Sequence, residues 1–194
     1  MTDRATLSEI VAVQRPRRAD ARRNLDALLA AARDAFASKG VDTSLEDIAR
    51  QAGVGIGTLY RNFPTRRHLF ETVYAEEVDS LCRLAEELCD VPAWGALTSW
   101  LRRIVDSTVT IRAVREALSD ESEVFVTCRR SLLDAGEPLL RRAQTAGQAR
   151  PDITFDDLLR MVSGIAGAAF TDTAQRDRVL TVALDGVRTD GAGQ

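Results

Sequence analysis

The sequence contains few of the residues that build metal centres and disulfide frameworks. Its 194 residues include one histidine, His68, and three cysteines, Cys82, Cys89 and Cys128. An odd number of cysteines without a paired spacing is typical of a reducing compartment, and a single histidine removes nearly every histidine-based metal site. We therefore expect neither a metal ion nor a cofactor.

Long apolar runs, targeting signals and catalytic motifs are also missing from the sequence. No window approaches the ~18–20 consecutive apolar residues that a membrane span needs, and the charges of the N-terminal residues do not have the order of a signal peptide. These two features predict a cytoplasmic protein with no membrane partner. Because there is no G-x-G-x-x-G after a strand and no Walker motif, a small helical enzyme is the least favoured interpretation.

A basic surplus over the whole chain is absent, which at first disfavours a nucleic-acid partner. The formal net charge is −3. This net charge combines two parts of opposite sign. Residues 1–70 contain 12 Arg and Lys against 8 Asp and Glu, whereas residues 71–194 contain 14 Arg and Lys against 21 Asp and Glu. Within the basic part, residues 15–23 contain five arginines and one aspartate. Such a block is typical of a segment that meets a polyanion, so the N-terminal part is the candidate nucleic-acid-binding region.

The spacing of apolar residues predicts an all-α protein of about nine helices. The first, over residues 20–39, carries its apolar side chains on one face, and Gly40 follows as its stop: Leu25, Leu28, Leu29, Ala32 and Phe36. Gly136 and Pro138 predict a kink or a split in a later helix. The other expected helices cover residues 44–53, 56–62, 65–89, 94–112, 113–119, 121–147, 155–170 and 173–188.

The stretch from Ser44 to Phe63 has the spacing of a helix-turn-helix. Thr43 or Ser44 begins its first helix as a cap, and Gly53 lies where a sharp turn between helices needs a left-handed backbone. On the second helix, four residues form an inward stripe: Ile56, Leu59, Tyr60 and Phe63. The outward positions are Gly57, Thr58, Arg61 and Asn62, and the last three have side chains that can hydrogen-bond base edges in a major groove.

The residues from Ala21 to Tyr74 resemble the N-terminal DNA-binding domain of TetR/AcrR-type bacterial transcriptional regulators. The resemblance is carried by the run Gly57-Thr58-Leu59-Tyr60-Arg61-Asn62-Phe63-Pro64-Thr65-Arg66-Arg67-His68-Leu69. It implies a homodimer that binds double-stranded operator DNA, with three N-terminal helices joined by a long fourth helix to a C-terminal helical ligand-binding and dimerisation domain. It also implies that Thr58, Arg61 and Asn62 face bases.

The same resemblance implies contacts to the DNA backbone. Ser44, the Tyr60 hydroxyl and Arg66 would each contact the phosphate backbone. Gly55 and Gly57 depart from the family pattern, since a larger side chain often occurs there, and they permit close backbone approach to the DNA. Arg17 and Arg18 in the basic block are expected to track phosphates and add affinity without reading sequence.

We expect four parts along the chain. They are a flexible basic arm at 1–19, the DNA-binding domain at 20–74 with its motif at 44–63, a helical effector-binding and dimerisation domain at 75–188, and a tail at 189–194. The resemblance fades in the third part. A largely apolar small-molecule effector would bind among its helices, although core packing explains the candidate pocket residues equally well: Trp100, Ile104, Thr108, Phe125, Cys128 and Met161.

The last two expected helices are candidates for a dimer interface. Segment 155–170 is apolar around much of its circumference, which is more than a surface helix in a small protein needs. An ordinary buried hairpin is the alternative. The candidate interface residues are Leu158, Val162, Ile165, Ala169, Leu180 and Leu184.

These features together favour a homodimeric transcriptional regulator, a repressor that a small molecule releases from its operator, with activation as the other known outcome in such families. The alternative is a regulator that responds to thiol oxidation. Cys82 and Cys89 lie seven residues apart in one predicted helix, roughly 10 Å of rise, which is beyond the reach of a disulfide. Cys128 would have to pair with one of them or across subunits.

Overall fold

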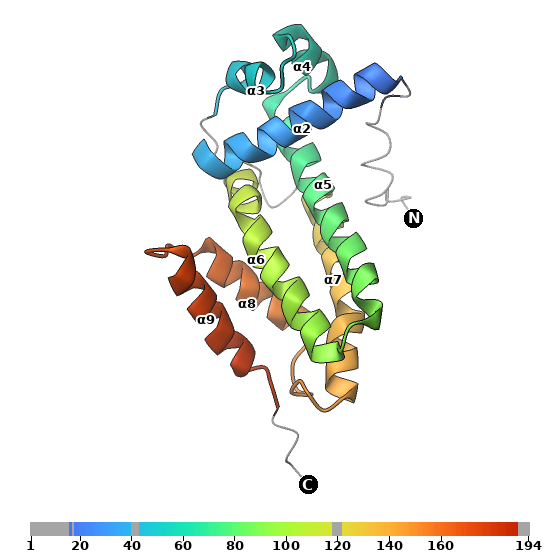
Figure 1. Ribbon diagram of the computed structural model, residues 1–194, viewed down its shortest axis with the longest axis vertical. Helices are drawn as coiled ribbons and strands as arrows, with labels where there is room; N and C mark the ends of the chain where they lie inside the picture. The colour runs from blue at the N-terminus through green and yellow to red at the C-terminus, as the bar shows by residue number, and fades with distance from the viewer. Residues whose placement is uncertain (1–15, 17, 40–42, 118–121, 190–194) are drawn as a thin grey trace. The chain divides into compact units, whose positions relative to one another are not determined.

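The computed structural model describes residues 16, 18–39, 43–117 and 122–189, without the side chains of 39 and 108–117. These residues form eight α-helices, one short 3-10 helix and an isolated β-bridge between Ala149 and Arg188, which confirms the all-α prediction (Figure 1). The elements are α2 (Ala19–Lys39), α3 (Leu45–Gln51), α4 (Ile56–Asn62), α5 (Arg66–Glu87), η2 (Leu88–Asp90), α6 (Ala93–Ala117), α7 (Glu123–Thr145), α8 (Phe155–Gly167) and α9 (Thr173–Asp185).

One of the expected helix boundaries is wrong. The expected boundary between segments 94–112 and 113–119 is absent, because α6 is continuous from Ala93 to Ala117 and no glycine or proline interrupts it there. Residues 118 and 119 lie outside the described residues. Helix α7 is not split, and runs through Gly136 and Pro138. Gly136 is required there for packing, since a Cβ atom at this position would lie 2.1 Å from Cζ of Phe155.

The chain divides into two compact units. Unit 1 comprises Met1–Asp79 and Val109–Arg129, and unit 2 comprises Ser80–Thr108 and Arg130–Gln194. Helices α5, α6 and α7 therefore each contribute residues to both units. Residues 109–129 belong to the same unit as the N-terminal helices.

The core of unit 1 is built on the apolar face of α2. All five residues expected on that face are buried, which confirms the one-sided helix: Leu25, Leu28, Leu29, Ala32 and Phe36. The Phe36 ring stacks on Phe70 of α5 with ring centroids 4.3 Å apart. Further along α5, Tyr74 stacks on Phe125 of α7 at 5.6 Å. These aromatic pairs hold α2 and the first turns of α7 against α5.

The core of unit 2 is centred on Trp100 of α6. Its ring packs on Phe155 with centroids 5.4 Å apart, and its indole Nε1 donates a hydrogen bond of 2.7 Å to the carbonyl of Leu81. Arg142 of α7 donates to the carbonyls of Leu88 and Val91 at 3.2 and 2.7 Å. These bonds satisfy carbonyls where α5 has ended and α6 has not begun, so the connection between the two helices is fixed.

Candidate DNA-binding site

Helices α3 and α4 and the turn between them have the geometry that the sequence predicts. Ser44 is the N-cap of α3, and its hydroxyl accepts a hydrogen bond of 3.0 Å from the backbone N–H of Asp47. Gly53 has a φ of +68°, the left-handed conformation expected of the turn. Thr43, just before the N-cap, is held against α2, since its buried hydroxyl donates to the carbonyl of Ala35 at 3.1 Å. The two short helices are thus held by local bonds as well as by packing.

Helix α4 buries one edge only. Leu59 and Phe63 are inside the core, as predicted. Ile56 and Tyr60 are exposed, so their place in the inward stripe is wrong. The helix has seven residues and packs on its neighbours through a single row of side chains. Residues on either side of that row face solvent. The exposed Tyr60 ring leaves its hydroxyl free to reach outward.

The outward polar residues of α4 are connected to one another. Arg61 donates from Nε to the carbonyl of Gly57 at 3.1 Å and from Nη2 to the Thr58 hydroxyl at 3.2 Å. Asn62 donates from Nδ2 to the carbonyl of Thr58 at 2.7 Å. Arg61 is exposed, whereas Thr58 and Asn62 are half-buried.

The glycines near the start of α4 face open space. A Cβ atom at Gly55 or Gly57 would meet nothing within 4 Å among the described residues. Packing inside the chain therefore does not require glycine at either position. Their small size is consistent with a close approach of an external partner to the backbone.

The first turn of α5 continues the polar surface. The Thr65 hydroxyl accepts from the backbone N–H of His68 at 3.1 Å and caps the helix. The guanidinium of Arg66 lies over the ring of Phe70, 5.4 Å from its centroid. Its Nη2 is buried without a hydrogen-bond partner in the part of the chain that the structure describes. Arg66 therefore retains a donor group one residue after the cap.

Basic residues continue along the start of α2. Arg18, Arg22 and Arg23 are exposed, and Arg23 pairs with Asp20 on its own helix. Arg17 lies outside the described residues. These exposed arginines belong to the basic block of residues 15–23, whose contact with DNA stays a prediction.

Comparison with known proteins identifies the two parts of the chain. The family model for bacterial regulatory proteins of the tetR family matches residues 28–73, which include α3 and α4. The family model described as the C-terminal domain of SbtR-like transcriptional regulators matches residues 92–189. The chain belongs to the TetR family. It is therefore a DNA-binding transcriptional regulator, and its family is not one of enzymes.

Solved and curated relatives agree with this family. The TetR transcriptional regulator SCO0520 of Streptomyces coelicolor is 38% identical, with a TM-score of 0.70 over 85% of this chain and 98% of that one. A TetR regulatory protein of Mycobacterium vanbaalenii is 31% identical, with a TM-score of 0.70 over 90% of this chain and 100% of that one. The HTH-type transcriptional regulator SAR0097 of Staphylococcus aureus (strain MRSA252) is 29% identical over 123 residues, or 58% of this chain, and the match spans 64% of that relative's length.

This TetR-family regulator has a second outward surface on α8 and α9. Four of the six residues expected at a dimer interface are buried inside unit 2 and are not available to a partner: Leu158, Val162, Leu180 and Leu184. Ile165 and Ala169 are accessible. Two valines of α9, the second of the two helices expected at the interface, face outward, Val179 at 41% and Val182 at 71% exposure. Val179 and Val182 are interspersed with the buried Leu180 and Leu184 along α9, so the sequence pattern alone does not show which of these apolar residues face outward.

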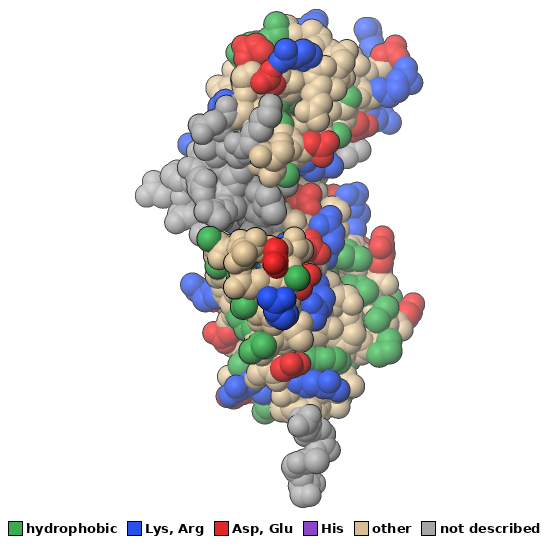
Figure 2. All heavy atoms as spheres, turned by 60° about the vertical axis from the view of Figure 1, so that its left-hand side comes forward, with side chains coloured by type: hydrophobic (Ala, Val, Ile, Leu, Met, Phe, Trp, Pro, Cys, Tyr) green, Lys and Arg blue, Asp and Glu red, His purple; other side chains and the backbone are tan. Residues whose placement is uncertain are grey.

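Several accessible residues of α8, of α9 and of the segment between them are apolar or small. We define the α8–α9 face as Ile165, Ala169, Val179 and Val182, with the exposed small residues Gly164, Gly167 and Ala168 beside them. Figure 2 shows hydrophobic side chains among charged ones over the lower part of the drawn surface, which carries these helices. Exposed branched side chains beside glycines permit the close approach of another helix.

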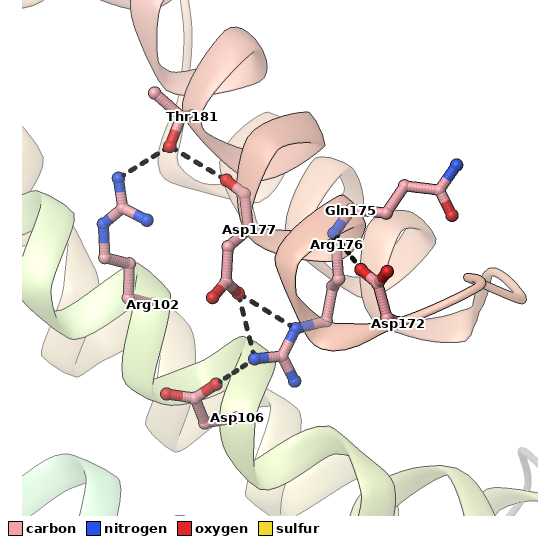
Figure 3. Close-up of polar contacts among 7 residues, drawn as sticks. All are labelled: Arg102, Asp106, Asp172, Gln175, Arg176, Asp177 and Thr181. Atoms are coloured by element: carbon pink, nitrogen blue, oxygen red, sulfur yellow. Dashed lines mark hydrogen bonds and ion pairs between the residues drawn. The ribbon is translucent and has the colours of Figure 1, made fainter.

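Polar contacts fix α9 against α6 within unit 2 (Figure 3). The Arg176 side chain is only 19% exposed, and its Nη2 donates to Asp106 of α6 at 2.6 Å and to Asp177 at 3.1 Å. One turn further along, Arg102 donates to the Thr181 hydroxyl at 3.1 Å. Because these bonds and the buried leucines act on the same side of α9, they hold its valines outward.

The residues expected in an effector pocket are divided between the two units. Trp100 and Ile104 are buried in unit 2, and Met161 is half-buried there. Phe125 and Cys128 belong to unit 1, and the side chain of Thr108 lies outside the described part. Trp100 has its hydrogen bond and its aromatic contact inside the core. Its present role is packing, so the pocket residues remain a prediction.

The three cysteines lie in different environments. Cys89 is exposed and lies in η2 rather than in the helix that contains Cys82. Cys82 is half-buried and donates to the carbonyl of Ser131 at 3.6 Å, while Cys128 is fully buried. No disulfide joins these three cysteines. The redox alternative stays a prediction.

None of the helices among the described residues is both long and apolar enough to cross a membrane. Within the same residues, no group of three or more His, Cys, Asp and Glu side chains is arranged to hold a metal ion.

Proposed function

We propose that this regulator acts as a homodimeric repressor that a small, largely apolar molecule releases from its operator. The observation that carries the dimer is the α8–α9 face. Exposed valines beside small residues are unfavourable in water, and a second copy of the same face would cover them across a two-fold axis.

DNA recognition supports the same conclusion. Helix α4 has seven residues and offers few side chains to base edges. A single helix of this length gives limited specificity, whereas two copies related by a two-fold axis contact successive major grooves about 34–36 Å apart. The operator is therefore expected to be a two-fold symmetric sequence.

A matched pair of valines tests the dimer. Val179 on α9 is 41% exposed and Val126 on α7 is 40% exposed, so they differ in location but not in accessibility. Val179→Glu should yield monomers in sedimentation and lower operator affinity by at least about tenfold, because a buried unpaired carboxylate at the interface costs several kcal/mol. Val126→Glu should remain dimeric. Wild-type protein that sediments as a monomer at micromolar concentration would contradict the proposal.

Selection from random DNA provides an independent test. Full-length protein is incubated with a pool of random duplexes, and the retained sequences are read. A two-fold symmetric consensus is expected, because a symmetric dimer presents the same helix to each half-site. An enriched site without internal symmetry would refute the homodimer, and the absence of any enriched site would refute sequence-specific binding.

The proposed effector acts through helices that contribute to both units. The family implies an effector-binding C-terminal domain, and α5, α6 and α7 each contain residues of unit 1 and unit 2. A molecule that binds unit 2 and favours one packing of these helices would change the separation of the two copies of α4. Ligand binding and operator binding would then be coupled reciprocally.

A thermal-shift screen tests this coupling. Small apolar compounds that raise the melting temperature of the protein are collected, because ligands that bind only the folded state stabilise it. Operator affinity is then measured with and without each compound. A decrease of about fivefold or more for such compounds is expected, which corresponds to a coupling free energy of roughly 1 kcal/mol. A set of tightly bound compounds that all leave operator affinity unchanged would contradict the mechanism.

A further inference from the structure

The guanidinium of Arg61 is already bound along one of its edges. A guanidinium has two edges that can each donate a pair of parallel hydrogen bonds, a side edge with Nε and Nη2 and an end edge with Nη1 and Nη2. In α4 the side edge is occupied, because Nε donates to the carbonyl of Gly57 and Nη2 to the hydroxyl of Thr58. These two bonds fold Arg61 back along its own helix and fix the plane of the group.

The end edge of Arg61 remains available. The side chain is exposed, and neither Nη1 nor the second hydrogen of Nη2 bonds to another described residue. Two parallel N–H groups match the O6 and N7 acceptors of guanine in the major groove, and no other base presents that pair of acceptors. Because the side edge fixes the plane, less rotamer entropy is lost when the end edge binds.

Asn62 is placed differently from Arg61. Its Nδ2 donates to the carbonyl of Thr58 at 2.7 Å, and the side chain is half-buried at the last residue of α4. An asparagine that reads adenine must present both its amide nitrogen and its amide oxygen to the base edge. The bond to Thr58 turns the amide toward the helix backbone and away from this arrangement.

We propose that Thr58 and Arg61 act as one recognition unit that selects a guanine in each operator half-site. Arg61 contacts the base, Thr58 orients the guanidinium, and Asn62 is a positioning residue that stabilises the end of α4. The inference rests on the proposed function, because it requires that α4 enters the major groove of a two-fold symmetric operator.

The experiment measures base preference in addition to affinity. The operator selected by the wild-type protein is synthesised with each of the four bases at every half-site position, and the full-length protein is titrated against each at one salt concentration. For the wild type, one guanine should be preferred over the other bases by about fivefold to 150-fold, the range for a bidentate arginine contact. Arg61→Ala should remove the preference at that position only.

Two substitutions at Thr58 separate orientation from packing. Thr58→Val keeps the branched shape and removes the hydroxyl, and should lower the guanine preference by about threefold or more, because one hydrogen bond to a charged group is lost. Thr58→Ser keeps the hydroxyl and should retain the preference. Arg61→Lys should lose most of it, since an ammonium donates from a single point and not from two parallel N–H groups.

Two further variants complete the test. Asn62→Ala should weaken binding to every operator by a similar factor and leave the order of base preference unchanged. Arg50→Ala is the charge control, because Arg50 is an exposed arginine on α3 that pairs with Asp47 of its own helix. It removes the same charge as Arg61→Ala, and the guanine preference should survive.

The outcomes distinguish this inference from the proposed function. If the wild-type protein selects a consensus without two-fold symmetry, or selects no consensus, both the proposed function and this inference are overturned. A symmetric consensus whose guanine preference survives Arg61→Ala overturns the recognition unit alone. A preference that Thr58→Val leaves intact overturns the orienting role of Thr58, and a base preference that changes in Asn62→Ala overturns the positioning role of Asn62.

Discussion

Two short helix pairs, α3–α4 and α8–α9, are built in similar ways and present different outer faces. Each first helix has a hydroxyl residue as its N-cap, Ser44 for α3 and Thr154 for α8. The second helix of each pair buries leucine on its inner side, Leu59 in α4 and Leu180 in α9. The inner faces of the two pairs are therefore chemically alike. What distinguishes the pairs is the outer face.

The outer faces differ in the chemistry that they offer. Helix α4 presents the Thr58 hydroxyl and the Arg61 guanidinium, groups that match base edges and phosphates. Helix α9 presents Val179 and Val182, which can be covered only by another apolar surface. Helix length and packing do not predict which partner a pair binds, whereas the outward side chains do.

The largest expected effect comes from a comparison of the inner and outer faces of α9. Leu180→Ala should reduce the free energy of unfolding by about 2–5 kcal/mol, because it removes a buried side chain and leaves a cavity. The neighbouring Val179→Ala should change it by less than about 0.5 kcal/mol in the monomer, since Val179 is exposed. Chemical denaturation at low protein concentration measures both. Equal losses would contradict the assignment of the two faces.

The next effect compares an inward glycine with an outward one. Gly136→Ala should cost about 1–3 kcal/mol, because the added Cβ would lie 2.1 Å from the Phe155 ring. Gly57→Ala meets nothing within 4 Å and should leave stability unchanged or raise it by up to about 1 kcal/mol, as expected for alanine in a helix. Operator affinity should respond in the opposite order, with the larger loss in Gly57→Ala.

A double variant checks the cause of the Gly136 effect. Phe155→Leu removes the ring that the new methyl would contact, so it should recover part of the loss when combined with Gly136→Ala. Additive losses in the two single variants would show that the contact with Phe155 is not the reason for the glycine.

A smaller effect compares the two N-caps. Ser44→Ala and Thr154→Ala each remove a cap bond, to the N–H of Asp47 at 3.0 Å and of Asp157 at 3.3 Å. Each should cost about 1 kcal/mol. Only Ser44→Ala should also reduce operator affinity at temperatures where both proteins are folded, because Ser44 is the cap expected to meet the DNA backbone. Equal operator affinity in the two variants would remove Ser44 from the proposed interface.

The smallest expected effect is a pH dependence confined to the start of α8. Hydrogen bonds from the hydroxyl and the backbone N–H of Thr154 lower the pKa of Asp157. The carboxylate therefore contributes stability above its unfolded pKa of about 3.9, and that contribution is lost as the pH falls through the lower folded value. Asp157→Asn should flatten this part of the pH profile of the melting temperature. Asp47 occupies the corresponding position of α3, so the same substitution at Asp47 is the comparison for this pH profile.

Much of the fold follows from local signals in the sequence. The five buried residues of α2 have the spacing of one helix face, and Gly53 adopts the left-handed turn that only glycine adopts at little cost. Ser44 caps α3, as one of two neighbouring candidates. Each of these features depends on residues a few positions apart, so the pattern along the chain contains enough information to predict it.

Features that depend on distant residues were not predictable in the same way. Ile56 and Tyr60 have the spacing of an inward stripe, yet α4 rests on its neighbours along Leu59 and Phe63 only. Gly136 has the sequence signal of a helix break, yet it is the contact point for Phe155, which lies 19 residues away in the sequence. The expected break after residue 112 was also absent, because an amphipathic pattern does not specify where a long helix ends.

The sequence by itself determined the helical class, the helix-turn-helix and its caps, and the TetR-type motif around Gly57–Leu69, because periodicity and capping operate within one or two helical turns. Only the tertiary structure decided which apolar residues of α8 and α9 remain exposed and which edge of Arg61 is already bound. Burial depends on which other helix lies against a given face, and side-chain hydrogen bonds depend on distances between atoms that sequence spacing does not fix.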